Sequence, residues 1–177
     1  MRAPAYQYVL CLFLAIVGGL LGIIGAVIQE LQSGSAFILL PFVGAPIIEE
    51  ALKPSGIYLA LLWWSRALTS QLFTAVLCAI SGLVFGVIES FVYVTLYVED
   101  ASDEFIVFRF SVPLGLHALC SYLVGLGLNQ RVLDWAAGRS PLPRASRNSY
   151  IAAVALHGAY NTMAVILSLS GVLDFED

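Results

Sequence analysis

Hydrophobic residues run through this chain in five long stretches, separated by short polar connections. The stretches cover residues 7–28, 36–63, 70–97, 110–130 and 150–171. Each reaches the ~20 apolar residues that a membrane-spanning helix needs. The pattern therefore predicts an all-α, polytopic bundle of about five transmembrane helices, and residues 1–177 are expected to form one transmembrane domain.

The first stretch is predicted to be a membrane anchor and not a signal peptide, because its apolar run is longer than the ~7–15 residues of a signal h-region. Gly18 and Gly22 are spaced four residues apart. Such small residues let two helices approach closely in a membrane, so this face is expected to pack against another helix.

The second stretch is the least regular. Pro54 has no backbone N–H, so the carbonyl of Glu50, four residues earlier, lacks its usual helical partner. A kink or an unwound turn is expected there. Within a membrane such irregular backbone is tolerated where it is buried in protein or lines a wet cavity.

Composition supports a membrane protein and argues against a nucleic-acid-binding protein. Hydrophobic residues make up 60% of the chain and charged residues 11%, with a mean hydropathy of +0.91. Soluble domains have about 25% charged residues. The net charge is −4, so no basic surface is available for nucleic acid and a nucleic-acid partner is not expected.

Arginines in the connections predict the orientation. Arg66 lies in the connection after the second stretch, and four more arginines lie in the connection 131–149. The positive-inside rule places both connections in the cytoplasm, together with the amino terminus. Arg109 contradicts this assignment, because it lies at the predicted outer end of the fourth helix. We expect its long side chain to reach the membrane interface.

Ionisable and polar residues interrupt four of the apolar stretches at helical spacing. They are Glu49, Glu50 and Lys53 in the second, Glu89 in the third, one turn after Phe85, His117 and Ser121 in the fourth, and His157 and Asn161 in the fifth. A charge near the middle of a bilayer costs roughly 2.5–3.5 kcal/mol. Such residues usually face the bundle interior and mark a relay, a pathway or a catalytic site.

The two adjacent glutamates are predicted to have different roles. They point about 100° apart on a helix, and Lys53 lies within pairing reach of both. If Lys53 neutralises Glu50, Glu49 is left as a general base that activates water. The structural alternative is an ion pair that only holds helices together.

The two histidines allow more than one interpretation. His117 shares a helical face with Ser121, and His157 shares one with Asn161. Imidazole and amide groups can stabilise an oxyanion, but each pair can also form an ordinary interhelical hydrogen bond. Glu49, His117 and His157 together would form a His₂Glu set of the kind that catalytic zinc uses. HExxH is absent and the ligands lie on separate helices, so no cofactor is expected and zinc is a minority option.

The ordered motifs resemble those of the PrsW family of intramembrane proteases, which is akin to the CAAX prenyl endopeptidase and bacteriocin-processing (CPBP) superfamily. They read Glu49-Glu50-x-x-Lys53, Phe85-x-x-x-Glu89, His117-x-x-x-Ser121 and His157-x-x-x-Asn161. The resemblance covers residues 45–165. It departs from the prenyl-protease relatives at Glu89, where they carry His.

This resemblance implies a glutamate-dependent intramembrane endopeptidase. A prokaryotic plasma membrane is the expected location. The substrate would be a membrane-anchored protein such as an anti-sigma factor. Glu49 would activate water, Glu50 would pair with Lys53, and His117, His157 and Asn161 would position the water and stabilise the oxyanion. Two alternatives remain open at this point: a non-catalytic scaffold of the same fold, and a small proton-coupled transporter.

Overall fold

The computed structural model describes residues 3–33, 40–98 and 100–170, and this part of the chain folds into helices without strands. The long helices are α1 (Ala5–Ser33), α4 (Gln71–Val92), α6 (Val112–Gly127) and α8 (Arg144–Leu169). The shorter ones are η2 (Leu40–Gly44), α2 (Ala45–Leu52), α3 (Ser55–Trp64), η3 (Ser65–Ala67), η4 (Tyr93–Tyr97), α5 (Asp103–Arg109) and α7 (Gln130–Ala136). The prediction of an all-α transmembrane bundle is confirmed.

The second predicted span is a broken helix, whereas the other four predicted spans each contain a continuous one. Within the described residues, four helices are long and apolar enough to cross a membrane: Ala5–Ile28, Gln71–Tyr97, Asp103–Gly127 and Arg144–Leu169. The predicted span 36–63 is not one of them. Residues 36–39 of that span lie outside the described part, and the remainder runs as η2, α2 and α3. Residue 171 of the last predicted span also lies outside it.

Pro54 separates α2 from α3. Helix α2 ends at Leu52, and Pro54 stands at the start of α3 with ψ of 13°, outside the helical range. The absent N–H of proline explains the break. The hydroxyl of Ser81 in α4 donates a hydrogen bond to the carbonyl of Lys53, next to the break. A side chain of a neighbouring helix thus supplies a hydrogen bond to a backbone carbonyl in the broken turn.

Glycines allow α1 to cross this broken segment closely. A Cβ on Gly56 would lie 1.7 Å from the backbone oxygen of Leu14, and one on Gly18 would lie 2.6 Å from the carbonyl oxygen of Lys53. Only residues without a Cβ fit at such distances. The close packing predicted from Gly18 and Gly22 is therefore present, and α1 covers the segment that carries Lys53.

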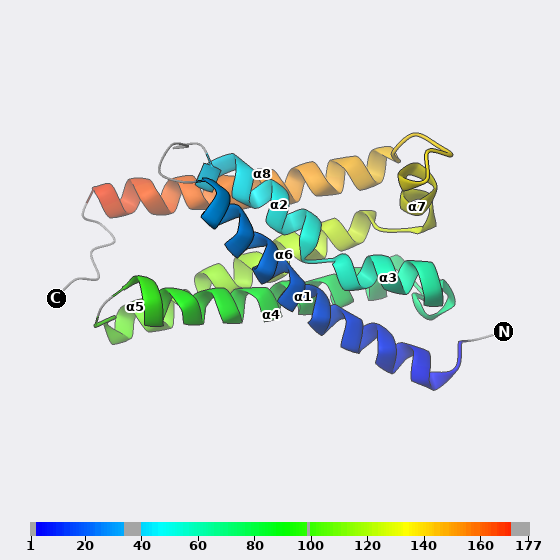
Figure 1. The fold of residues 1–177 in the computed structure, drawn as a ribbon, viewed down its shortest axis with the longest axis horizontal. Helices are drawn as coiled ribbons and strands as arrows, with labels where there is room; N and C mark the ends of the chain where they lie inside the picture. The colour runs from blue at the N-terminus through cyan, green and yellow to red at the C-terminus, as the bar shows by residue number, and fades with distance from the viewer. Residues whose placement is uncertain (1–2, 34–39, 99, 171–177) are drawn as a thin grey trace.

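The bundle has an apolar end and a polar end. Most residues of the buried apolar cluster come from the first half of α1, from α3, from the first half of α4 and from the second half of α6. These segments lie near the end where α1 begins, on the right in Figure 1. The connection after α3 and helix α7 lie at that same end, as the orientation prediction requires. Which end faces the cytoplasm stays a prediction.

Candidate active site

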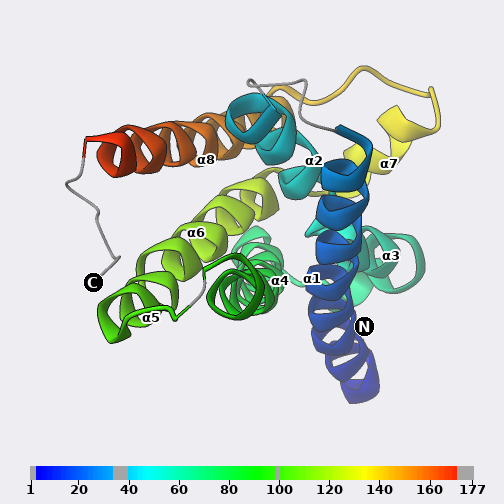
Figure 2. The same cartoon turned by 60° about the vertical axis from the view of Figure 1, so that its left-hand side comes forward.

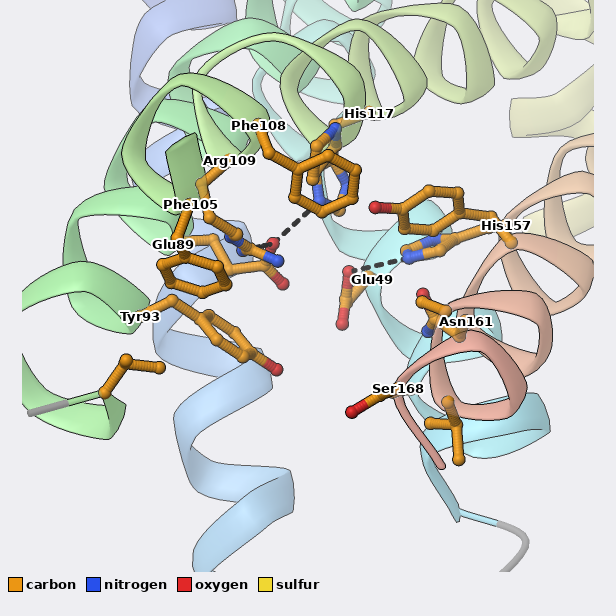
Figure 3. Close-up of a pocket in the computed structure, with 16 residues that line it drawn as sticks. Glu49, Glu89, Tyr93, Phe105, Phe108, Arg109, His117, His157, Asn161 and Ser168 are labelled. Atoms are coloured by element: carbon orange, nitrogen blue, oxygen red, sulfur yellow. Dashed lines mark hydrogen bonds and ion pairs between the residues drawn. The ribbon is translucent and has the colours of Figure 1, made fainter. Parts of the chain in front are cut away.

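A cavity of about 390 Å³ lies toward the other end of the bundle, where α2, α4, α5, α6 and α8 meet. Figure 2 shows α8 beside α6 and α2, while α5 lies at the far end of α6. Figure 3 shows the cavity with polar groups on both sides. The predicted site residues that line it are Glu49, Glu89, His117, His157 and Asn161. Four separate helices supply them.

Glu50 and Lys53 lie outside the cavity lining and are fully buried. The Nζ atom of Lys53 donates to Oε1 of Glu50 at 2.6 Å, and Nδ1–H of His157 donates to that same oxygen at 2.9 Å. Since Nδ1 of His157 is used in this way, its Nε2 is left as an acceptor. Nε2 lies 3.8 Å from Oε2 of Glu49. Glu50 thus orients the imidazole of His157.

Glu49 is 5% exposed and lies in the cavity wall. Its Oε2 atom is buried, and it has no hydrogen-bond partner within the described part of the chain. The nearest ionisable neighbours are Nζ of Lys53 at 3.3 Å and Nε2 of His157 at 3.8 Å. A buried carboxylate oxygen without a hydrogen bond is costly. Its position is suited to a proton, a water or a cation.

Both ring nitrogens of His117 are engaged. Lys53 donates to Nδ1 at 2.8 Å, which leaves the proton on Nε2 to be donated to Oε2 of Glu89 at 2.8 Å. The ring also packs against Phe85, with the two centroids 5.0 Å apart. Lys53 lies 4.2 Å from the centroid of the Phe85 ring. Phe85 therefore supports the site from outside the cavity.

The interpretation of Arg109 as an interfacial side chain was wrong. Arg109 is 8% exposed, lines the cavity, and donates from Nη2 to Oε2 of Glu89 at 2.9 Å. The position of Arg109 near a helix end suggested interfacial exposure. A glutamate within an apolar stretch needs a cationic partner. Glu89 could therefore have predicted that Arg109 lies in the bundle interior.

Ser121 does not line the cavity. It is fully buried where α6 crosses α4, and a Cβ on Gly82 would lie 2.7 Å from its Oγ atom. Asn161, in contrast, follows His157 by one helical turn and faces the cavity (Figure 3). The structure therefore brings Asn161 to the histidines and leaves Ser121 in the helix contact.

The three candidate metal ligands are brought together. Ligand atoms of Glu49, His117 and His157 all lie within 4.8 Å of one another, and the donor types are those of catalytic zinc sites. The position of these ligands on separate helices was an argument against a metal. It no longer holds, because the fold brings the three side chains together. A metal would have the ammonium of Lys53 as a close neighbour, since Nζ lies 2.8 Å from Nδ1 of His117.

Comparison with known proteins identified one family. The family model described as PrsW family intramembrane metalloprotease matches residues 4–175. No curated protein and no solved structure matched the chain. Kinship with the CPBP superfamily stays a prediction from the motifs. Because the match spans nearly the whole sequence, the chain belongs to the PrsW family of intramembrane metalloproteases.

Proposed function

We propose that this chain hydrolyses a peptide bond of a membrane-anchored protein by means of a water molecule that Glu49 activates. Family membership supports an intramembrane protease and a membrane-embedded protein substrate. It favours this activity over the scaffold and the transporter. The observation that carries the proposal is the Oε2 atom of Glu49, which is buried in the cavity wall and receives no hydrogen bond from the described residues.

The neighbours of Glu49 suit the role of a general base. Lys53 lies closer to Glu50, at 2.6 Å, than to Glu49, at 3.3 Å. The charge of Glu50 is therefore compensated by Lys53, and this pair has a structural role. Glu49 has a carboxylate oxygen that can accept a proton from water. Nε2 of His157 can accept a hydrogen from the same water, because its Nδ1–H is held by Glu50.

The reaction follows from these positions. Glu49 removes a proton from water, and the water oxygen bonds to the carbonyl carbon of the peptide. The negative charge that develops on the carbonyl oxygen is stabilised by the amide of Asn161, which lines the cavity. The carbon–nitrogen bond then breaks, and Glu49 delivers its proton to the leaving amine. The products are a carboxylic acid and an amine, and the proton of the acid then passes to the amine to give a carboxylate and an ammonium group.

The family name implies a metal, and the donor types fit one once a ring nitrogen of His117 exchanges its contact with Lys53 or Glu89 for the metal. Glu49, His117 and His157 would hold it. A bound zinc would act there as a Lewis acid toward water and the peptide carbonyl. Under the proposal, the protein's own side chains carry the proton transfers. A prokaryotic plasma membrane and a substrate such as an anti-sigma factor remain part of the proposal.

The test is proteolysis of a panel of single-span peptides by the purified protein in lipid vesicles. Glu49→Gln is compared with Glu104→Gln, a matched change of an exposed carboxylate in α5. We expect cleavage by the wild type and by Glu104→Gln, loss of cleavage in Glu49→Gln, and retention in the presence of chelator. Cleavage that chelator abolishes and zinc restores would assign the chemistry to a metal. A folded wild type that cleaves no peptide would contradict the proposal.

A further inference from the structure

Arg109 is tied to one segment of α4 and η4 by three contacts. Its guanidinium donates to Glu89 at 2.9 Å, and its backbone carbonyl accepts from the hydroxyl of Ser90 at 2.8 Å. Its Cζ atom lies 3.9 Å from the centroid of the Tyr93 ring. These contacts attach the end of α5 to α4. Because α5 carries Phe105 and Phe108 of the cavity wall, Arg109 also fixes that wall.

The ion pair of Arg109 leads directly to a histidine of the proposed site. Oε2 of Glu89 accepts from Arg109 and from Nε2–H of His117. The Glu89 side chain is 21% exposed, so it borders open space and needs a partner to hold its rotamer. Arg109 is the hydrogen-bond partner of Glu89 that lies outside the predicted set of glutamates and histidines.

We propose that Arg109 is a positioning residue of the protease site. It fixes the carboxylate of Glu89, and Glu89 in turn holds His117 with its proton on Nε2 and its Nδ1 toward Lys53. This inference rests on the proposed function. It assigns a role to a residue that lies outside the four motifs, and it explains how a glutamate at position 89 is used.

A purely structural role for Arg109 would give a different result in a double-mutant cycle. If Arg109 acts through Glu89, removal of both should cost no more activity than removal of Glu89 alone. If Arg109 only anchors α5 through its contact with Tyr93, its removal should lower stability and activity to the same extent whether or not Glu89 is present.

The experiment measures kcat and KM for a cleaved single-span peptide with Arg109→Gln, Glu89→Gln, the double variant and Arg109→Lys. Arg139→Gln is the matched control, because Arg139 forms an exposed ion pair with Asp134 at 2.7 Å. We expect Arg109→Gln to lower kcat about 10–100-fold, the range for residues that orient catalytic ligands. KM should change less than twofold, Arg109→Lys should recover part of kcat, and Arg139→Gln should behave like the wild type.

A second readout does not depend on activity. The chain has two histidines, so selective ¹⁵N labelling of histidine reports the ring nitrogens of only two imidazoles, which His157→Gln assigns. In the wild type, His117 should show a protonated Nε2. Arg109→Gln should shift this signal toward tautomer exchange, whereas Arg139→Gln should leave it unchanged.

The outcomes separate this inference from the proposed function. A wild type that cleaves nothing contradicts the function. An active wild type with unchanged kcat and imidazole signals in Arg109→Gln overturns the positioning role alone. An equal loss of kcat in the presence and absence of Glu89 also overturns it. If Arg109→Gln does not fold, the same cycle with Arg109→Lys decides, since a loss of kcat that disappears in the Glu89→Gln background supports the role.

Discussion

The Nζ atom of Lys53 lies 2.6 Å from Oε1 of Glu50 and 2.8 Å from Nδ1 of His117. One buried ammonium therefore connects the carboxylate of α2 to the imidazole of α6. The broken turn at Pro54 places the lysine between these two helices, and the glycine face of α1 covers it. Lys53 is thus a centre of the fold as well as of the site.

Lys53→Met should destabilise the protein strongly. The substitution leaves Glu50 as a buried charge without its cation, and breaking a buried pair in this way costs about 3–5 kcal/mol. Thermal or denaturant unfolding in detergent measures the change in the free energy of unfolding. Arg139→Gln, which removes an exposed ion pair, should cost less than about 1 kcal/mol. Equal effects of the two substitutions would contradict the central role of Lys53.

Glu50→Gln and Glu49→Gln should differ in stability although the residues are adjacent. Glu50 accepts hydrogen bonds from Lys53 and His157, and each bond to a charged group contributes about 1.5–3 kcal/mol. Oε2 of Glu49 accepts none from the described residues. Glu50→Gln should therefore lower the unfolding temperature, whereas Glu49→Gln should keep it near the wild-type value. Unfolding followed by circular dichroism tests this order, and the reverse order would refute it.

Gly56→Ala should disrupt the contact between α1 and α3. The added Cβ would meet the backbone of Leu14 at 1.7 Å, and overpacking of this kind costs about 1–3 kcal/mol or more. Gly115→Ala is the matched control, because no atom of the described chain lies within 4 Å of its Cβ. That control should be neutral or stabilising by up to about 1 kcal/mol. Similar unfolding midpoints for both variants would count against the close approach of α1.

Ser81→Ala should weaken the broken turn. The substitution removes the hydroxyl that donates to the carbonyl of Lys53, and an unsatisfied buried acceptor costs about 1–3 kcal/mol. Ser111→Ala serves as the comparison, since its hydroxyl also bonds a backbone carbonyl but is exposed. Unfolding measurements should show the larger loss for Ser81→Ala. Faster amide exchange in α2 and α3 would locate the effect at Pro54.

Several features of the fold could be predicted from residues that act locally. The apolar stretches predicted the long helices, and Pro54 predicted the break because a missing N–H affects only its own turn. Gly18 and Gly22 predicted a close helix contact. The sequence could not supply the convergence of Glu49, Glu89, His117 and His157, because the rotation of each helix about its axis is set by packing. The side chain of Arg109 was expected at the membrane interface for the same reason, because the sequence does not show which way its helix is turned.

The separation of the apolar end from the cavity end has a consequence for how the family can diversify. Apart from Lys53 and its partners, the buried apolar side chains lie toward one end of the bundle, and the side chains that line the cavity lie toward the other. Residues of the cavity wall such as Phe105, Tyr160 and Val165 can therefore be exchanged without weakening the anchor of the fold. New sequence preferences can therefore arise from substitutions at the cavity end of the helices, while the residues at their other end keep the protein folded in the bilayer.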